Sequence, residues 1–316
     1  MGWLTKRLLS IPLEETRVSR RGFHVRDPAL APRLETIGQT FLAGYHAGLD
    51  DAGPRGLARE LNSIPAELQG FAFEGAGMAL TLLDNLFPLN RRRFQGFLET
   101  EGSPHVYLLY VGAGWAMARL PWLRWRTSAF LSTLDPLLGW LAMDGYGFHQ
   151  GYFYWPRFML RHELPNDLPP YACCAFDQGL GRSLWFVDGA DVAQIPVTIA
   201  GFSETRHADL WSGVGLACAY AGGVSESHIE ALRESAGIYA DHLAQGAAFA
   251  AAARFRAGNL AAHTELACRV LCGLSAESAA CATDAALKNL PVDRGEPAYE
   301  IWRHRIRDAM PLRVVR

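Results

Sequence analysis

The sequence FAFEGAGMALTLLD, residues 71–84, is an apolar segment notched by Gly75 and Gly77. A weaker copy, DLWSGVGLACAYAG, covers residues 209–222 and places Gly213 on Gly75, an offset of 138 residues. A glycine inside a helix lets a neighbouring backbone come close, because no side chain separates the two. The repeated segment therefore predicts two close-packed helices and an internal duplication of the chain.

The same offset relates further segments. GLDDAG from residue 48 falls on FVDGAD from residue 186, and YVGAGWAMAR from residue 110 falls on AFAAAARFRA from residue 248. A coincidence between two alanine-rich helical segments is the alternative explanation. Apolar residues recur at spacings of three and four, and no alternating run of strand length stands out, although residues 185–202 can hide a strand. We predict an all-α protein of two similar helical halves, related by a pseudo-twofold.

Prolines and polar residues indicate where these units begin and end. Residues 1–30 are arginine-rich and interrupted by proline, which predicts an N-terminal arm that packs on the body or on a neighbouring protein. LPNDLPP, residues 164–170, is the predicted linker. The first helical repeat is therefore expected at residues 31–165 and the second at residues 172–316.

Composition points to a folded protein without a polyanionic partner. Half of the 316 residues are hydrophobic, 20% are charged, and the formal net charge is −2. This balance gives no general attraction to nucleic acid or anionic lipid, and the longest apolar run, residues 106–117, is too short to cross a bilayer. The six cysteines form no CxxC pair, and the first residues lack a secretory apolar core. We expect a cytoplasmic protein with reduced thiols and neither nucleic acid nor a membrane as partner.

Several standard catalytic motifs are missing from the sequence. It contains no GxSxG, GxxxxGK[ST] or HExxH, which disfavours hydrolase, P-loop and zinc-protease chemistry. Glu204 and His207 form one Glu-x-x-His pair, whereas a di-iron bundle needs two. No metal site is therefore predicted, and no cofactor can be assigned. The GxG pairs lie inside predicted helices, which favours helix packing over dinucleotide binding.

The candidate catalytic residues are polar side chains within apolar or glycine-rich segments, where burial is costly without a partner. Glu74 interrupts the apolar helix of residues 71–84; it is either a general acid or base with a raised pKa or a core carboxylate paired with an arginine such as Arg119. Asp144 and His149 lie in the glycine- and aromatic-rich residues 144–157, which we expect to be irregular or a broken helix. His149 can shuttle protons or bind a metal, or it can be a hydrogen-bonded structural histidine.

The candidate binding residues come from both halves. Arg182 lies in FDQGLGRSLWF, residues 176–186, which is expected to be a turn packed on aromatic rings. Asp209 is either a site residue or a helix N-cap. A polar network between the halves, or a plain salt-bridged seam, can include Arg256 and His263. Tyr146 and Trp115 belong to an aromatic excess that is mainly core but also suits a long unsaturated ligand.

Seven segments, in order, resemble the DUF1702 family, whose members are encoded in bacterial enediyne antibiotic gene clusters. The segments are FEGAGMAL from residue 73, VGAGWAMARL from 111, MDGYGFHQGYF from 143, FDQGLGRSLWF from 176, DLWSGVGLACAYAGG from 209, FRAGNLAAHTELACRVLCG from 255 and YEIWRHRIR from 299. The resemblance covers nearly the whole chain from about residue 20 and transfers no catalytic residue.

The resemblance implies an accessory protein of enediyne core biosynthesis. Its substrate would be the linear polyene made by the iterative polyketide synthase, and the step an isomerisation, cyclisation or desaturation. Two alternatives stay open: a noncatalytic protein that binds and shields the polyene or the enediyne, and a subunit of a multiprotein maturation complex. The expected partners are therefore a hydrophobic polyene and other proteins of the same cluster.

Overall fold

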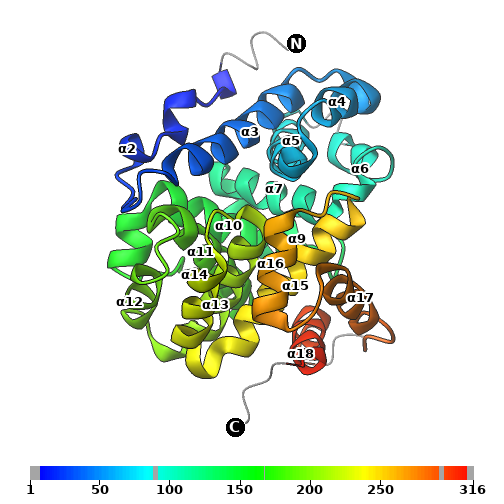
Figure 1. The fold of residues 1–316 in the computed structure, drawn as a ribbon. Helices are drawn as coiled ribbons and strands as arrows, with labels where there is room; N and C mark the ends of the chain where they lie inside the picture. Colours follow the sequence, from blue (N-terminus) through cyan, green and yellow to red (C-terminus); the bar gives the residue numbers. More distant parts are fainter. Residues whose placement is uncertain (1–7, 88–91, 167, 292–294, 312–316) are drawn as a thin grey trace.

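The computed structural model describes residues 8–87, 92–166, 168–291 and 295–311. These residues form helices and contain no strand, so the all-α prediction is confirmed. The longer helices of the body run from Ala31–Leu49 near the top of Figure 1 toward the C-terminal helix at the bottom. They are α3 (Ala31–Leu49), α5 (Ala66–Leu86), α7 (Val106–Arg119), α10 (Trp140–Phe153), α11 (Pro170–Val187), α13 (Glu204–Ala221) and α15 (Ala240–Arg256).

Each of these helices packs on the next one along the chain, and glycines bring the two backbones together. A Cβ atom on Gly75 of α5 would overlap the carbonyl oxygen of Phe41 in α3, and one on Gly44 would overlap the carbonyl oxygen of Ala72. Reciprocal glycine contacts of this kind recur at every following interface. The pairs are Gly77 with Gly112, Gly114 with Gly145, Gly147 with Gly179, Gly181 with Gly213, and Gly215 with Gly246.

The prediction that these glycines serve close helix packing is confirmed, and their spacing is shorter than a half of the chain. Successive contacts recur every 33 to 37 residues, so the 138 residues between Gly75 and Gly213 span four steps of one stack. Close contacts also continue across the predicted linker, since Gly147 before it meets Gly179 after it. Duplication of the chain into two halves stays a prediction.

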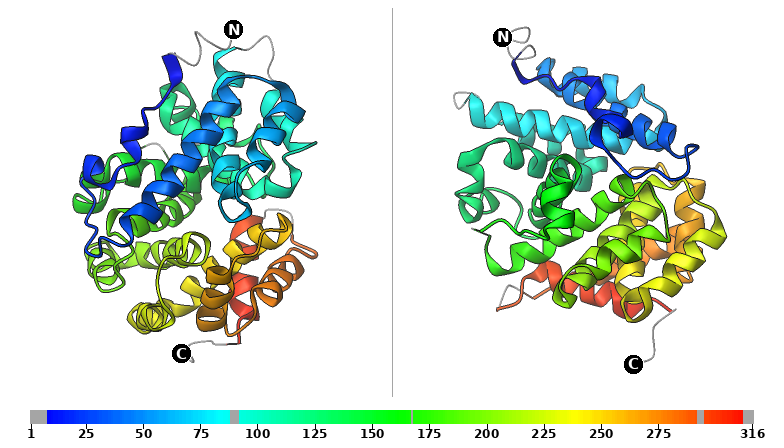
Figure 2. Two further views of the ribbon diagram at one scale, coloured as in Figure 1. Left: turned by 45° about the horizontal axis from the view of Figure 1, so that its top comes forward. Right: turned by 90° about the vertical axis from the view of Figure 1, so that its left-hand side faces the viewer.

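The stack curls back on itself at α13. The Arg33 Nε of α3 donates a hydrogen bond to the carbonyl oxygen of Ala221 at the end of α13, at 2.7 Å. The ring of Tyr220 in α13 packs edge-on against Phe71 of α5, with the ring centroids 5.1 Å apart. The first two and the sixth of the long helices therefore meet, and the two further views in Figure 2 show the curved arrangement.

Shorter helices complete the body. On the N-terminal side they are η1 (Leu13–Thr16), α2 (Val18–Arg21), α4 (Gly53–Asn62), α6 (Arg93–Leu98), η3 (Ser103–His105), α8 (Pro121–Arg124), α9 (Thr127–Leu131) and the π-helix η4 (Pro156–Leu160). On the C-terminal side they are α12 (Gln194–Ala200), α14 (Glu226–Ala236), η5 (Gly237–Tyr239), α16 (Ala262–Cys272), α17 (Ala276–Ala286) and α18 (Ala298–Ala309).

Glycines hide the helical period in two segments. Residues 144–157, expected to be irregular or a broken helix, belong to α10 as far as Phe153, and the π-helix η4 begins at Pro156 after the break. Residues 176–186, expected to be a turn, lie inside α11. A glycine costs up to about 1 kcal/mol in a helix, and this cost is offset here by close backbone packing on both neighbours.

Residues 128–142 belong to two separate helices. α9 ends at Leu131 and α10 begins at Trp140. Between them, the side chain of Asp135 accepts hydrogen bonds from the backbone N–H groups of Leu137 and Leu138, at 2.9 and 2.8 Å. The proline at residue 136 cannot donate a helical hydrogen bond, so the chain forms a side-chain-stabilised turn instead.

Candidate functional site

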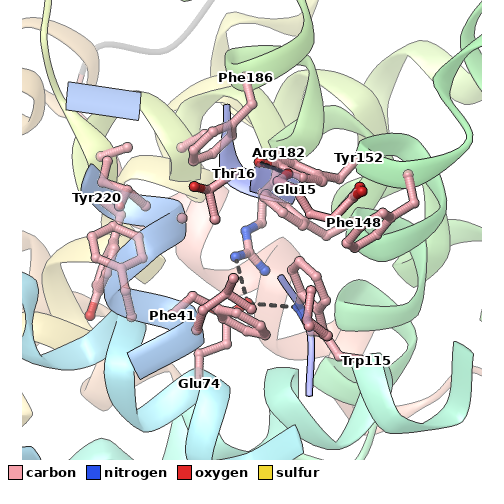
Figure 3. Close-up of a pocket in the computed structure, with 18 of the residues that line it drawn as sticks. Glu15, Thr16, Phe41, Glu74, Trp115, Phe148, Tyr152, Arg182, Phe186 and Tyr220 are labelled. Atoms are coloured by element: carbon pink, nitrogen blue, oxygen red, sulfur yellow. Dashed lines mark hydrogen bonds and ion pairs between the residues drawn. The ribbon is translucent and has the colours of Figure 1, made fainter. Parts of the chain in front are cut away.

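A cavity, here called cavity 1, lies inside the curl of the stack. Its walls come from α3, α5, α7, α10, α11 and α13, and they are mainly apolar. Its volume of about 50 Å³ has room for a few water molecules, so a larger ligand would have to displace side chains. The residues that line it include Phe41, Glu74, Trp115, Phe148, Arg182 and Tyr220 (Figure 3).

Glu74 places a carboxyl group on the wall of this apolar cavity. Its side chain is 2% exposed, its Oε1 accepts a hydrogen bond from the indole Nε1 of Trp115 at 2.9 Å, and the same oxygen lies 3.5 Å from Nη2 of Arg182. The sequence predicts an arginine such as Arg119 as one possible partner of Glu74, and the arginine found beside it is Arg182. Burial raises the pKa of Glu74, with a further contribution from Asp144, and it outweighs the lowering by Arg182 and Trp115.

Arg182 connects two buried carboxyl groups. Its guanidinium is bonded to Asp144 through Nη1 and faces Glu74 through Nη2, and it lies 4.9 Å from the ring centroid of Phe148. Figure 3 shows the guanidinium projecting into the cavity toward Glu74 and Trp115. One arginine neutralises only one of the two carboxylates, so a proton on Glu74 makes the cluster neutral. The attraction of Asp144 and Glu74 raises the pKa of Arg182 against the effect of burial, so the guanidinium keeps its charge.

A second cavity, cavity 2, lies on the other side of this cluster. Asp144 and Arg182 line it together with Phe249 of α15 and Trp302 of α18, and its volume is about 40 Å³. It shares Arg182, Leu216 and Tyr220 with cavity 1. The Arg182 cluster, defined as Glu74, Trp115, Asp144 and Arg182, therefore lies between two apolar spaces.

A chain of buried hydrogen bonds leads away from the Arg182 cluster. Gln178 donates to Asp144 at 2.8 Å, and Ser212 donates to the side-chain oxygens of Gln178 at 3.4 Å and Gln245 at 2.9 Å. Arg303 then donates to Gln245 at 3.2 Å and to Asp209 at 2.7 Å. These bonds satisfy polar groups that would otherwise be costly to bury.

The position of these residues in the helices gives a signal that the sequence reading missed. In five of the long helices a buried polar residue immediately precedes the glycine that packs on the preceding long helix, so it lies beside a close backbone contact. The residues in this position are Glu74, Asp144, Gln178, Ser212 and Gln245. The spacing of the glycines, applied helix by helix, would have found Gln245. No comparable pattern marks Tyr220, which lines both cavities.

The structure brings together four of the nine predicted site residues and separates the others from the cavities. Glu74, Trp115, Asp144 and Arg182 form the cluster. Tyr146 is buried and accepts a hydrogen bond from Gln150 at 3.1 Å. Asp209 lies inside α13, where it accepts a hydrogen bond from Arg303, and it is not an N-cap. Arg256 is exposed and donates to the carbonyl oxygen of Ser103 at 3.3 Å.

The two predicted histidines lie outside the cavity walls. His149 packs edge-on against Trp115 with ring centroids 5.4 Å apart, and burial together with Arg119 lowers its pKa to about 3, so it is neutral at pH 7. His263 contacts the carbonyl oxygen of Tyr220 at 3.0 Å. Burial and Arg254 lower the pKa of His263 to about 4.

The N-terminal residues cover cavity 1. Residues 8–25, called the strap, cross α3 and α10, and the side chains of Ile11, Glu15 and Thr16 line the cavity. Arg21 fastens the strap to α10 through bonds to the carbonyl oxygens of Phe153 at 2.6 Å and Tyr152 at 3.3 Å, and it is bonded within the strap to Glu15 at 2.7 Å. Part of the arm expected at residues 1–30 thus packs on its own chain.

Neither a metal site nor a membrane-spanning helix is found among the described residues. No group of three or more His, Cys, Asp and Glu side chains is placed to hold a metal ion in residues 8–87, 92–166, 168–291 and 295–311. Over the same part of the chain, every helix is too short or too polar to span a bilayer.

The fold and the cluster define a helical protein with a buried acid–arginine group between two apolar cavities. The chain belongs to the DUF1702 family: the family model, described as a protein of unknown function, matches residues 1–310. Comparison with curated proteins and with solved structures gave no match.

Proposed function

We propose that the protein isomerises the double bonds of a slender, largely apolar molecule bound in cavity 1, and that Glu74 carries the proton. The observation behind this proposal is a carboxyl group with a raised pKa on the wall of an apolar cavity. Such a group is protonated closer to neutral pH than an exposed glutamate, which suits general acid catalysis.

The proposed step is a double-bond shift that adds one proton to the chain and removes one proton from it. Glu74 donates its proton to one carbon of a conjugated chain, the double bonds shift, and the resulting Glu74 carboxylate removes a proton from another carbon. Arg182 and the indole N–H of Trp115 stabilise the carboxylate while it is charged. No oxidant is consumed. Cyclisation can begin with the same protonation, whereas desaturation requires an electron acceptor in addition.

We propose a linear polyene as the substrate. A narrow cavity with walls of Phe41, Phe148 and Trp115 suits a flat, unbranched chain. The family resemblance supplies the biological setting: an accessory step between the iterative polyketide synthase and the enediyne core.

A noncatalytic carrier is the second candidate, and the bonding of Glu74 supports it. A carboxyl group already held by Trp115 and Arg182 can be a structural partner of that arginine. Under this alternative the protein binds the polyene and returns it unchanged.

Incubation with a linear conjugated polyene in heavy water tests the two candidates. Isomerisation through Glu74 predicts a product of shifted absorbance that contains deuterium from the solvent. Glu74→Gln should lower the rate about 10²- to 10⁴-fold while the midpoint of thermal unfolding stays near that of the natural protein. Glu67→Gln, the same substitution at a partly exposed position of the same helix, is the control and should keep the rate. Binding without deuterium uptake would support the carrier instead.

A further inference from the structure

The two cavities share part of their walls. Arg182 extends from α11, and Leu216 and Tyr220 lie one turn apart on α13. All three line both cavities. The side chain of Leu216 is apolar, and within the described residues the buried hydroxyl of Tyr220 has no hydrogen-bond partner. Neither side chain would lose a hydrogen bond by moving aside, although Tyr220 would give up its ring contacts with Phe71 and with the guanidinium of Arg254. A ligand that spans both cavities has to replace those contacts.

The polar groups of this shared wall face the middle of the combined space. Arg182 supplies N–H donors, and Glu74 supplies an O–H donor when it is protonated. A ligand carboxylate would add a negative charge beside Asp144 and Glu74, whereas a carbonyl oxygen is an uncharged acceptor. The chemistry of the junction therefore favours a ligand with a carbonyl group.

We propose that the two cavities are the two arms of one binding site for an unbranched chain with a carbonyl group away from its ends. The carbonyl oxygen accepts hydrogen bonds from Arg182 and Glu74, one hydrocarbon arm lies along Trp115 and Phe148 in cavity 1, and the other lies along Phe249 and Trp302 in cavity 2. The Glu74 donor in this arrangement rests on the protonated carboxyl of the proposed function; the two-armed geometry rests on the shared wall.

The arms contribute to affinity through burial of their methylene groups. Each buried CH₂ strengthens binding about fourfold, so a chain that fills both cavities binds tighter than one confined to either. Moving the carbonyl to the end of a chain of the same length leaves one arm without a cavity to enter.

Isomeric straight-chain ketones test the proposal. One member of the pair has its carbonyl at the second carbon and the other at the middle carbon, and both carry ¹³C at the carbonyl so that NMR titration reports affinity and hydrogen bonding. The natural protein should bind the middle ketone at least about tenfold tighter. Ala253→Phe, which fills cavity 2, should remove this preference and leave the end ketone within about twofold. Ala217→Phe, which fills cavity 1, is the matched variant and should also remove the preference.

The smaller substitutions Ala253→Val and Ala217→Val, together with thermal unfolding, keep the test valid if a phenylalanine prevents folding. Equal affinity for the two ketones, or equal losses for both in Ala253→Phe, would overturn the two-armed site. The turnover experiment tests Glu74 separately. If Glu74→Gln keeps full activity, Glu74 is not the acid, but the preference for the middle ketone should remain because Arg182 still binds the carbonyl oxygen. Loss of activity in Glu74→Gln without any ketone preference refutes only the two-armed site.

Discussion

Arg182 and Arg303 are both buried arginines placed between two acidic side chains, yet their surroundings differ. Arg303 is 1% exposed and pairs with Asp209 and Glu300, each at 2.7 Å. Glu300 also accepts from Arg307 at 3.0 Å and from the hydroxyl of Tyr171 at 2.8 Å. This second group, the Arg303 cluster, lies outside both cavity walls as described.

The pKa values of the two glutamates move in opposite directions. Burial acts to raise the pKa of Glu300, but Arg303 and Arg307 more than compensate and hold it below its ordinary value. Burial raises the pKa of Glu74, which shares one arginine with Asp144. Glu300 is held by two arginines and a tyrosine hydroxyl, which makes it a structural carboxylate. Glu74 has one shared arginine and one indole N–H, which leaves it able to exchange a proton. The Arg303 cluster holds α18 in place, and the Arg182 cluster is the candidate site.

The first test concerns the scaffold that both clusters share. Gly179 follows Gln178 beside the Arg182 cluster, and Gly246 follows Gln245 beside the Arg303 cluster; a Cβ on either would overlap a carbonyl oxygen of the neighbouring helix. Gly179→Ala and Gly246→Ala should each lower the free energy of unfolding by about 4 kcal/mol or more in urea titrations. Gly96→Ala in α6 has open space and should be neutral or stabilise by up to about 1 kcal/mol. A tolerated alanine at Gly179 would contradict the close packing.

The second test removes each arginine. Arg303→Met should lower the free energy of unfolding by about 3–5 kcal/mol, because Asp209 loses its arginine and Glu300 keeps only Arg307 and the hydroxyl of Tyr171. Arg182→Met should cost less, about 1–3 kcal/mol, because Glu74 can take up a proton and leave one charge unpaired. Denaturant unfolding of the two variants measures the difference. Equal costs would mean that the clusters do not differ.

The third test uses pH. The folded-state pKa of Glu300 is lowered, so its stabilisation is present above about 4.5 and lost as the pH falls through the folded value. Glu300→Gln should therefore cost about 2 kcal/mol at pH 7 and less in acid. The folded-state pKa of Glu74 is raised, so its contribution is full below about 4.5 and lost as the pH rises through the folded value. Glu74→Gln should match or exceed the natural protein at pH 7, with its advantage vanishing in acid. Parallel pH profiles would contradict the comparison.

The fourth and smallest effect concerns access to the Arg182 cluster. Arg21→Ala removes the bonds of the strap to the carbonyl oxygens of Phe153 and Tyr152, and a total loss of about 1 kcal/mol should speed polyene association about fivefold. Stopped-flow fluorescence measures the rate. Arg20→Ala, whose exposed side chain contacts Glu15 at 3.4 Å, is the control and should leave the rate unchanged. An unchanged rate in Arg21→Ala would show that ligands enter by another route.

The sequence predicts the scaffold better than the site. Glycines in apolar segments indicate close helix packing, and two glycines two residues apart point to opposite sides of a helix, so Gly75 packs on α3 and Gly77 on α7. The partner of Glu74 was not predictable, since Arg182 lies 108 residues away and only the curl of the stack brings them together. The place of Tyr220 in the cavity walls was not predictable for the same reason, since it depends on the contact of α13 with α5, which are distant in sequence.

The most direct test of the central claim is a ¹³C NMR titration of the glutamate carboxyl groups, with Glu74→Gln and Glu300→Gln used to assign the two signals. We expect Glu74 to titrate above the ordinary value of 4.5 and Glu300 to titrate below it. We also expect a linear polyene or ketone to shift the signal of Glu74 alone. Titration of Glu74 at or below 4.5, or a ligand-induced shift confined to Glu300, would contradict the assignment of the Arg182 cluster as the functional site.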